Sequence, residues 1–85
     1  MMSLNQLVLV GRLANDLTLE DNKTTITMIT KENDTISCNV YNDLAKNILE
    51  YCKKDDIVGI KGHLTSKNGV LEIVVDSVSF LKDKE

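Results

Sequence analysis

The order of strand-like and helix-like segments is the feature that most constrains how this chain folds. Five runs of apolar or alternating residues are readable, at residues 7–13, 25–28, 35–41, 57–64 and 70–81. Alternation with a period of two is typical of strands. One helical pattern, for which Asn42 and Asp43 are the candidate N-caps, separates the third run from the fourth. Because 85 residues supply only one core, we expect one domain, with an ordered part at 3–81 and a short charged tail at 82–85.

Five strands with one helix between the third and the fourth is the element order of the OB-fold, a small Greek-key barrel. We therefore predict an all-β, five-stranded barrel. Lys67-Asn68-Gly69 predicts a tight turn between the last two strands. The mixed phase of the last run predicts either a bulge near Asp76-Ser77 or an interface on both faces of the strand. The first run is apolar at nearly every position, which predicts a strand covered on both faces.

The third run separates a core face from a polar face. The residues of one parity are apolar and are expected to point into the barrel: Ile36, Cys38 and Val40. The residues of the other parity are polar and end in an aromatic ring: Thr35, Ser37, Asn39 and Tyr41. The side chains of this second set are therefore available to a ligand.

Composition and charge argue against several functional classes. Acidic residues outnumber basic ones by 13 to 10, which argues mildly against nucleic acid, although the positions of the lysines matter more. No apolar run reaches the roughly 18–20 residues of a membrane span. No signal peptide is readable and there are only two cysteines, so we expect the cytoplasm.

Catalytic and metal-binding motifs are not readable. Scattered carboxylates and a single histidine form no nucleophile–base pair, and there is no glycine-rich phosphate loop. Cys38, Cys52 and His63 can in principle form a metal site, but a free cysteine is usually a small buried hydrophobic residue. We expect no enzyme, no metal, no cofactor and no small-molecule substrate.

Four segments, in order and at matching spacing, resemble one protein family. They are Asn5-Gln6-Leu7-Val8-Leu9-Val10-Gly11-Arg12-Leu13, Ile36-Ser37-Cys38-Asn39-Val40-Tyr41 followed by residues 43–47, residues 50–54 followed by 56–64, and Val78-Ser79-Phe80-Leu81. Together they resemble the bacterial and phage single-stranded DNA-binding proteins over nearly the whole chain. The resemblance implies an OB-fold that coats single-stranded DNA without sequence preference in replication, recombination or repair. It also implies self-association through the first strand, as a homodimer or homotetramer.

The chain departs from the family pattern at four places. Thr35 stands where the family usually has an aromatic residue, and Asn42-Asp43 stands where Gly-Lys is common. The hairpin between the last two strands is short, at about 66–69, and we expect the acidic tail that recruits partner proteins to be missing. These departures predict weaker DNA binding than in the family and no recruitment through a tail.

The candidate DNA-binding residues combine one aromatic ring with polar and basic side chains. Proteins of this kind stack bases on aromatic rings and follow the phosphates with lysines. Tyr41 is the candidate stacking residue, and its alternative role is to cover the barrel rim. The polar candidates are Thr35, Ser37 and Asn39, for which the alternative is an ordinary solvated strand face. The basic candidates are Arg12, Lys31, Lys53, Lys54, Lys61, His63 and Lys67.

Several of these residues also have simpler interpretations. Lys53 and Lys54 suit the negative end of the helix dipole, and Arg12 can form an interface or edge salt bridge with Asp16 or Glu20. Tyr51, on the expected buried side of the helix, and Phe80 are predicted to be core or interface residues.

Two other functions remain open from the sequence. One is an OB-fold protein-interaction module of the primosomal accessory type, with weak affinity for single-stranded DNA. The acidic net charge, the short hairpin and the missing aromatic residue favour it. The other is a relative by fold alone that binds RNA or another small partner.

Overall fold

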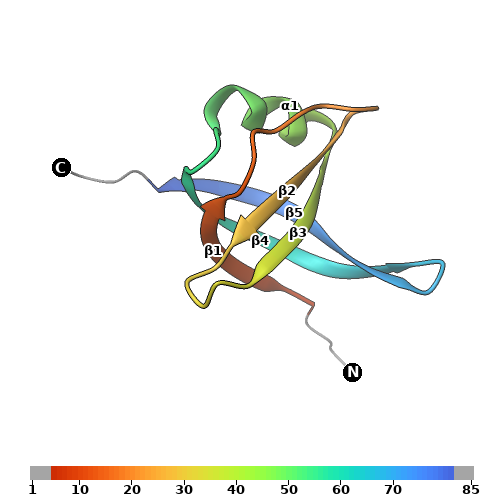
Figure 1. The fold of residues 1–85 in the computed structure, drawn as a ribbon. Coiled ribbons are helices and arrows are strands. Elements are labelled where there is room, and N and C mark those ends of the chain that lie inside the picture. Colours follow the sequence, from red (N-terminus) through yellow and green to blue (C-terminus); the bar gives the residue numbers. More distant parts are fainter. Residues whose placement is uncertain (1–4, 82–85) are drawn as a thin grey trace.

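Five strands close into a barrel in the computed structural model, which describes residues 5–81 (Figure 1). The elements are β1 (Leu7–Leu13), β2 (Lys23–Ile29), β3 (Thr35–Tyr41), α1 (Asn42–Tyr51), β4 (Ile57–Lys67) and β5 (Val70–Leu81). The order around the barrel is β1-β2-β3-β5-β4, and β4 pairs with β1 to close it. The predicted OB-fold is therefore confirmed. Residues 3–4 and 82–85, for which we expected the start of the ordered part and a charged tail, lie outside the described residues.

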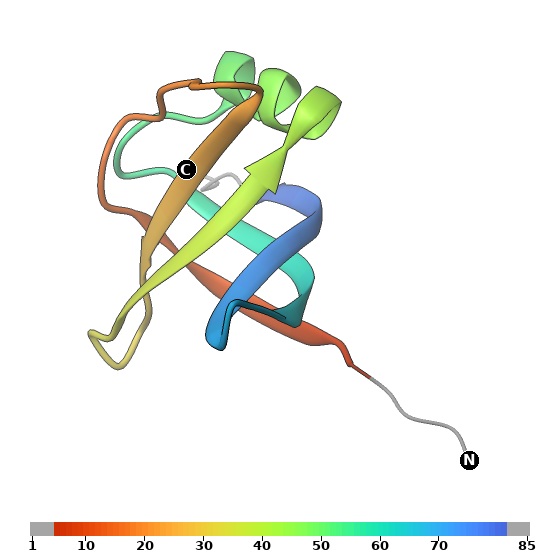
Figure 2. The same cartoon turned by 90° about the vertical axis from the view of Figure 1, so that its right-hand side faces the viewer.

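The core is made by alternate residues of the strands and by one face of α1. Figure 2 shows α1 at one end of the barrel, with β2 and β3 side by side and crossing over β4 and β5. The buried apolar residues are Leu13, Ile26, Met28, Cys38, Val40, Ala45, Ile48, Cys52, Val58, Ile60 and Val75. Two members of the predicted core face, Cys38 and Val40, are fully buried, and Ile36 packs against them while half-exposed.

The two free thiols are part of this core. Burial raises the pKa of both Cys38 and Cys52 to about 11, so both are protonated and unreactive at neutral pH. Within residues 5–81, no group of three or more histidine, cysteine or acidic side chains lies close enough together to hold a metal ion. The described helix is too short and too polar to cross a membrane.

The start and end of α1 differ from the prediction. Tyr41, in extended conformation, is the N-cap residue, and no side chain caps the helix. Asn42 instead adopts a left-handed backbone with φ of 58°, and its N–H donates to the carbonyl of Asn22 in the β1–β2 loop, at 2.7 Å. Asparagine tolerates this conformation better than most residues, so Asn42 turns the chain from β3 into α1. The helix ends at Tyr51, so Lys53 and Lys54 lie beyond its last turn.

The hairpin of β4 and β5 matches the predicted turn and bulge. Asn68 and Gly69 both have positive φ, 53° and 80°, as a tight two-residue turn requires. The register shifts by one residue between Lys61 and Gly62, which leaves Asp76 unpaired. A Cβ on Gly62 would lie 2.3 Å from the carbonyl oxygen of Val74, so this position requires glycine. The hairpin extends beyond the barrel and provides one wall for the site described below (Figure 1).

Two faces that the sequence predicted to be covered are exposed in the single chain. Val8 and Val10 of β1 are 62% and 53% exposed, because only the inner side of this strand faces the core and nothing in the described chain covers the other. Tyr51, predicted to be a core or interface residue, is 60% exposed and is therefore not a core residue. The helix buries Ala45 and Ile48, which places Tyr51 at the edge of its buried face. There its ring contacts that of Phe80 with centroids 5.7 Å apart.

Candidate nucleic-acid interface

An open groove of about 740 Å³ lies between β3 and the β4–β5 hairpin. The polar face of β3 forms one wall, and the hairpin forms the other. From β2 and β3 the lining residues are Lys23, Thr35, Ile36, Ser37, Asn39 and Tyr41. From the hairpin they are Leu64, Lys67, Asn68, Val70, Leu71, Glu72 and Ile73. The groove thus joins hydrogen-bonding groups and one aromatic ring with an apolar surface.

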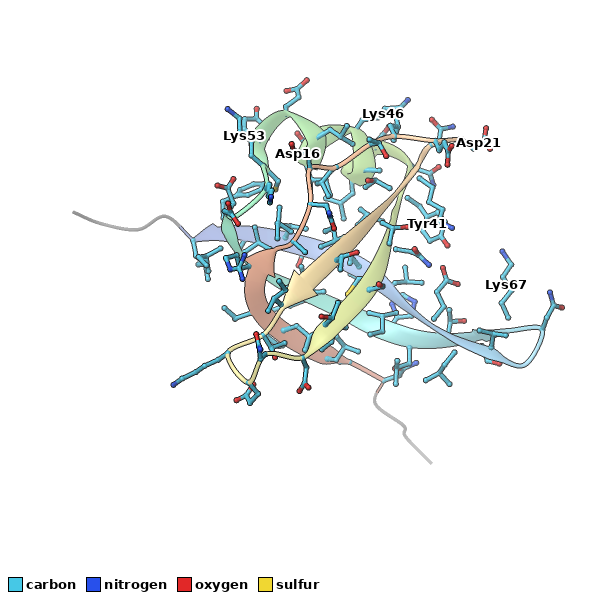
Figure 3. All side chains as sticks on the ribbon, viewed as in Figure 1. Asp16, Asp21, Tyr41, Lys46, Lys53 and Lys67 are labelled. Carbon is cyan, nitrogen blue, oxygen red and sulfur yellow. The ribbon has the colours of Figure 1, made fainter. Side chains whose placement is uncertain are left out.

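Five of the predicted site residues meet in this groove. They are Thr35, Ser37, Asn39, Tyr41 and Lys67. Figure 3 shows Tyr41 and Lys67 on the side of the molecule from which the hairpin projects, and Lys53 on the opposite side near the end of α1. The polar face of β3 therefore lines the groove together with one basic candidate, and the other basic candidates lie elsewhere.

The other six candidates are spread over the barrel. Arg12 and Lys31 line a smaller cavity of about 330 Å³ on another side. Arg12 pairs with Asp55 at 3.0 Å, not with the expected Asp16 or Glu20. The chain between α1 and β4 runs back beside the end of β1, where the Asp55 amide donates to the Leu13 carbonyl.

The remaining basic candidates lie on β4 and after α1. His63 Nδ1 lies 2.9 Å from the Asp76 carboxylate, at the β5 bulge. Lys61 is exposed on the outer side of β4. The backbone amides of Lys53 and Lys54 donate to the carboxylates of Asp56 and Asp16, at 2.9 Å each. These two amides thus hold the loop after the helix in place.

Tyr41 is held by a hydrogen-bond network that joins three strands. Its hydroxyl donates to Oε2 of Glu72 on β5. The Asn39 side-chain amide donates to the same oxygen at 2.6 Å, and Thr25 Oγ1 donates to Asn39 Oδ1 at 3.0 Å. The bond to Glu72 raises the pKa of the Tyr41 hydroxyl, and the same bond lowers the pKa of the Glu72 carboxyl. The ring is half-exposed and held in one orientation, which is favourable for stacking because little further ordering is needed.

Two lysines flank the groove, and only one of them was predicted from the sequence. Lys67 lies at the tip of the hairpin, and Lys23 is the register partner of Tyr41 at the start of β2. Both lie near enough to Glu72 to lower the pKa of its carboxyl further. Lys23 was missed because the clean alternation that marks the second strand begins only at Thr25, whereas β2 begins two residues earlier.

Glu72 was also missed, although it holds Tyr41. It is 31 residues away in sequence, and its position depends on which strand becomes the neighbour of β3. The pairing that brings it close joins Asn39 to Val74 between the parallel strands β3 and β5. The tight turn and the hairpin register could have placed Glu72 on the same side as Lys67. They could not have placed it beside Tyr41.

Several known proteins are similar in sequence to this chain over most of its length. No family model matches the chain. Single-stranded DNA-binding protein 2 of Staphylococcus aureus strain Mu50 is 33% identical over 105 residues, which covers 95% of this chain and 74% of that protein. This chain belongs to the single-stranded DNA-binding protein family. Single-stranded DNA-binding protein 1 of S. aureus strain COL is 35% identical over 95% of this chain and 63% of its own length. The single-stranded DNA-binding protein of Oceanobacillus iheyensis is 30% identical, with 95% and 65% covered.

The chain spans only part of the length of these relatives. It spans somewhat less than two thirds of the length of the S. aureus strain COL and O. iheyensis proteins. The aligned region of 105 residues exceeds the 85 residues of this chain, so the relatives carry insertions within it. The domain described above is therefore a reduced form of the one they contain.

Solved structures show the same fold. The mitochondrial single-stranded DNA-binding protein Rim1 of S. cerevisiae superposes with a TM-score of 0.76 at 18% identity, over 98% of this chain and 99% of that one. A chain of the S. pombe Stn1–Ten1 complex superposes with a TM-score of 0.77 at 17% identity, over 94% of this chain and 60% of that one. At these identities the likeness establishes the OB-fold.

Proposed function

We propose that this protein binds single-stranded DNA in the groove between β3 and the β4–β5 hairpin. It would coat and protect the strand in replication, recombination or repair, and its role is binding rather than catalysis. The observation that carries this proposal is Tyr41, a half-exposed ring held in one orientation inside a groove with a lysine on either side. The names of the relatives support DNA binding over the protein-interaction alternative.

Different parts of the groove contact the base and the phosphate of a nucleotide. Bases meet the Tyr41 ring, and the exposed apolar side chains of Leu64 and Leu71 lie elsewhere in the groove lining. Phosphates remain near Lys23 and Lys67 at the edges. A net charge of −3 does not oppose this arrangement, because exposed charges more than about 10 Å apart are largely screened at physiological salt. Binding therefore depends on local charges and on stacking.

Removing the two groove lysines is expected to make binding less dependent on salt. Each lost phosphate contact on a single strand lowers the slope of log affinity against log salt by about 0.7. The double variant Lys23→Gln/Lys67→Gln should therefore bind a labelled oligonucleotide more weakly, with a slope smaller by roughly 1.4. A titration followed by fluorescence anisotropy at four salt concentrations measures this slope.

The matched control carries the same charge change outside the groove. Lys53→Gln/Lys54→Gln removes two lysines whose structural contacts are made by backbone amides, so its affinity and slope should equal those of the unchanged protein. If both double variants lose affinity equally and show the same decrease in salt slope, the phosphate contacts are not confined to the groove. The assignment of Lys23 and Lys67 as the phosphate-binding lysines is then wrong.

We also propose that two copies associate through the outer face of β1. Val8 and Val10 are exposed there, and a side chain at Gly59 would contact both Val10 and Leu81. Ile57 pairs with Leu81 across the hairpin and is also exposed. We call these four residues, Val8, Val10, Ile57 and Leu81, the β1 patch. A contiguous apolar surface of this kind is typical of protein interfaces, and it supports a homodimer or homotetramer.

The two buried free thiols suit a reducing compartment, so we place this activity in the cytoplasm.

A further inference from the structure

We propose that Glu72 selects among the bases that enter the groove, favouring those with an exocyclic amino group over thymine. This inference rests on the proposed binding of single-stranded DNA. The protein would still coat any sequence, but its affinity would depend on base composition.

The carboxylate of Glu72 lies at the edge of the candidate stacking ring. Its Oε2 atom accepts hydrogen bonds from the Tyr41 hydroxyl and from the Asn39 amide. The Tyr41 hydroxyl is at the outer end of its ring, so a base stacked flat on that ring extends its own edge toward the same carboxylate. Glu72 is therefore within reach of the atoms by which bases differ.

One oxygen of this carboxylate is available to a ligand. Among residues 5–81, no protein group donates a hydrogen bond to Oε1 of Glu72. Glu72 lines the groove and is only partly buried. An ionised carboxylate accepts hydrogen bonds and cannot donate them, and the lowered pKa of Glu72 is consistent with the ionised form at neutral pH. The group facing the stacked base is thus a pure acceptor.

An acceptor at this place distinguishes the two pyrimidines. Cytosine presents an amino group at N4, which carboxylate side chains accept in base recognition, whereas thymine presents the O4 acceptor and a methyl group. Thymine retains only N3–H as a donor, and this group lies between two carbonyl oxygens that repel a carboxylate. The two pyrimidines also differ in stacking strength and in the flexibility of their strands. A change in the ratio of the affinities for oligo(dC) and oligo(dT) when Glu72 alone is replaced therefore reports on the edge contact.

The test compares oligo(dC) with oligo(dT) of equal length on the unchanged protein and on Glu72→Gln. Glutamine keeps an oxygen that can accept from the Tyr41 hydroxyl, removes the charge and adds an amide donor that suits thymine O4. We expect the preference for oligo(dC), written as the ratio of the two dissociation constants, to fall by roughly fivefold, which is the low end of the discrimination by a good base contact. Glu72→Ala should lower it as well, because it removes the acceptor without adding a donor.

Glu50→Gln is the matched control, because it makes the same change on α1, outside the groove lining. The ratio of its dissociation constants for oligo(dC) and oligo(dT) should equal that of the unchanged protein. If Glu72→Gln and Glu72→Ala bind both oligonucleotides with the same ratio as Glu50→Gln, the inference about Glu72 is wrong and the proposed function remains. If the unchanged protein binds neither oligonucleotide, the proposed function is wrong and this inference with it.

Discussion

Replacing Tyr41 by alanine is expected to weaken the binding of single-stranded DNA by roughly 5- to 150-fold. This range corresponds to the loss of one stacked base, about 1–3 kcal/mol. The effect should be large because the chain has only three aromatic residues and Tyr41 is the one that lines the groove. Anisotropy titration of a labelled oligonucleotide at low salt measures the change.

Two further variants separate stacking from other roles of Tyr41. Tyr41→Phe keeps the ring but removes the hydroxyl that donates to Glu72, so it should retain most of the affinity. Tyr51→Ala removes the other tyrosine, which is exposed outside the groove, and should bind as the unchanged protein does. Thermal unfolding followed by circular dichroism checks that all three variants fold. Folded Tyr41→Ala protein with unchanged affinity would contradict the stacking role.

Replacing Val10 by aspartate is expected to dissociate the proposed dimer. The side chain of Val10 is 53% exposed in the single chain, so an aspartate there should be tolerated by the fold. In a dimer formed through the β1 patch, the same carboxylate would be buried near its copy, without a partner for its charge. Buried or like-charged groups at an interface cost several kcal/mol, so the dissociation constant should rise by more than about 30-fold. Sedimentation velocity over a range of concentrations measures it.

Val70→Asp makes the same substitution at a valine of similar exposure, 66%, on the hairpin. It should leave the association unchanged, because Val70 lies outside the β1 patch. The proposal of self-association through β1 fails if the unchanged protein sediments as a monomer at tens of micromolar. It fails equally if the two aspartate variants associate to the same extent.

The fold could be predicted from the sequence because its signals are local. Alternation in residues 35–41 marks a strand and also assigns its two faces, so the polar wall of the groove followed directly. Asn68-Gly69 specifies a turn by its own backbone preference. The mixed phase near Asp76 reported a real shift of register. Each of these features depends on residues a few positions apart.

The groove could be predicted only in part because its remaining contacts are long-range. Glu72 meets Tyr41, and Arg12 meets Asp55, through strand neighbours that no local pattern encodes. Lys53, Lys54 and Lys67 lie at or beyond the ends of helices and strands, where alternation does not assign a side, which is why Lys67 was placed in the site together with Lys53 and Lys54. The exposure of Val10 has a related cause. An apolar residue gives the same pattern whether its own chain or a second copy covers it.

The anisotropy of a labelled oligo(dT), titrated with the unchanged protein at low and at moderate salt, tests the central claim most directly. The ligand must carry the label because the chain has no tryptophan. A duplex of equal length is the comparison, since its bases are already paired and stacked and cannot reach the Tyr41 ring. We predict saturable binding of the single strand at low salt, weaker binding at moderate salt, and much weaker binding of the duplex at both. No binding of the single strand at low salt, or equal binding of the duplex, would contradict the account.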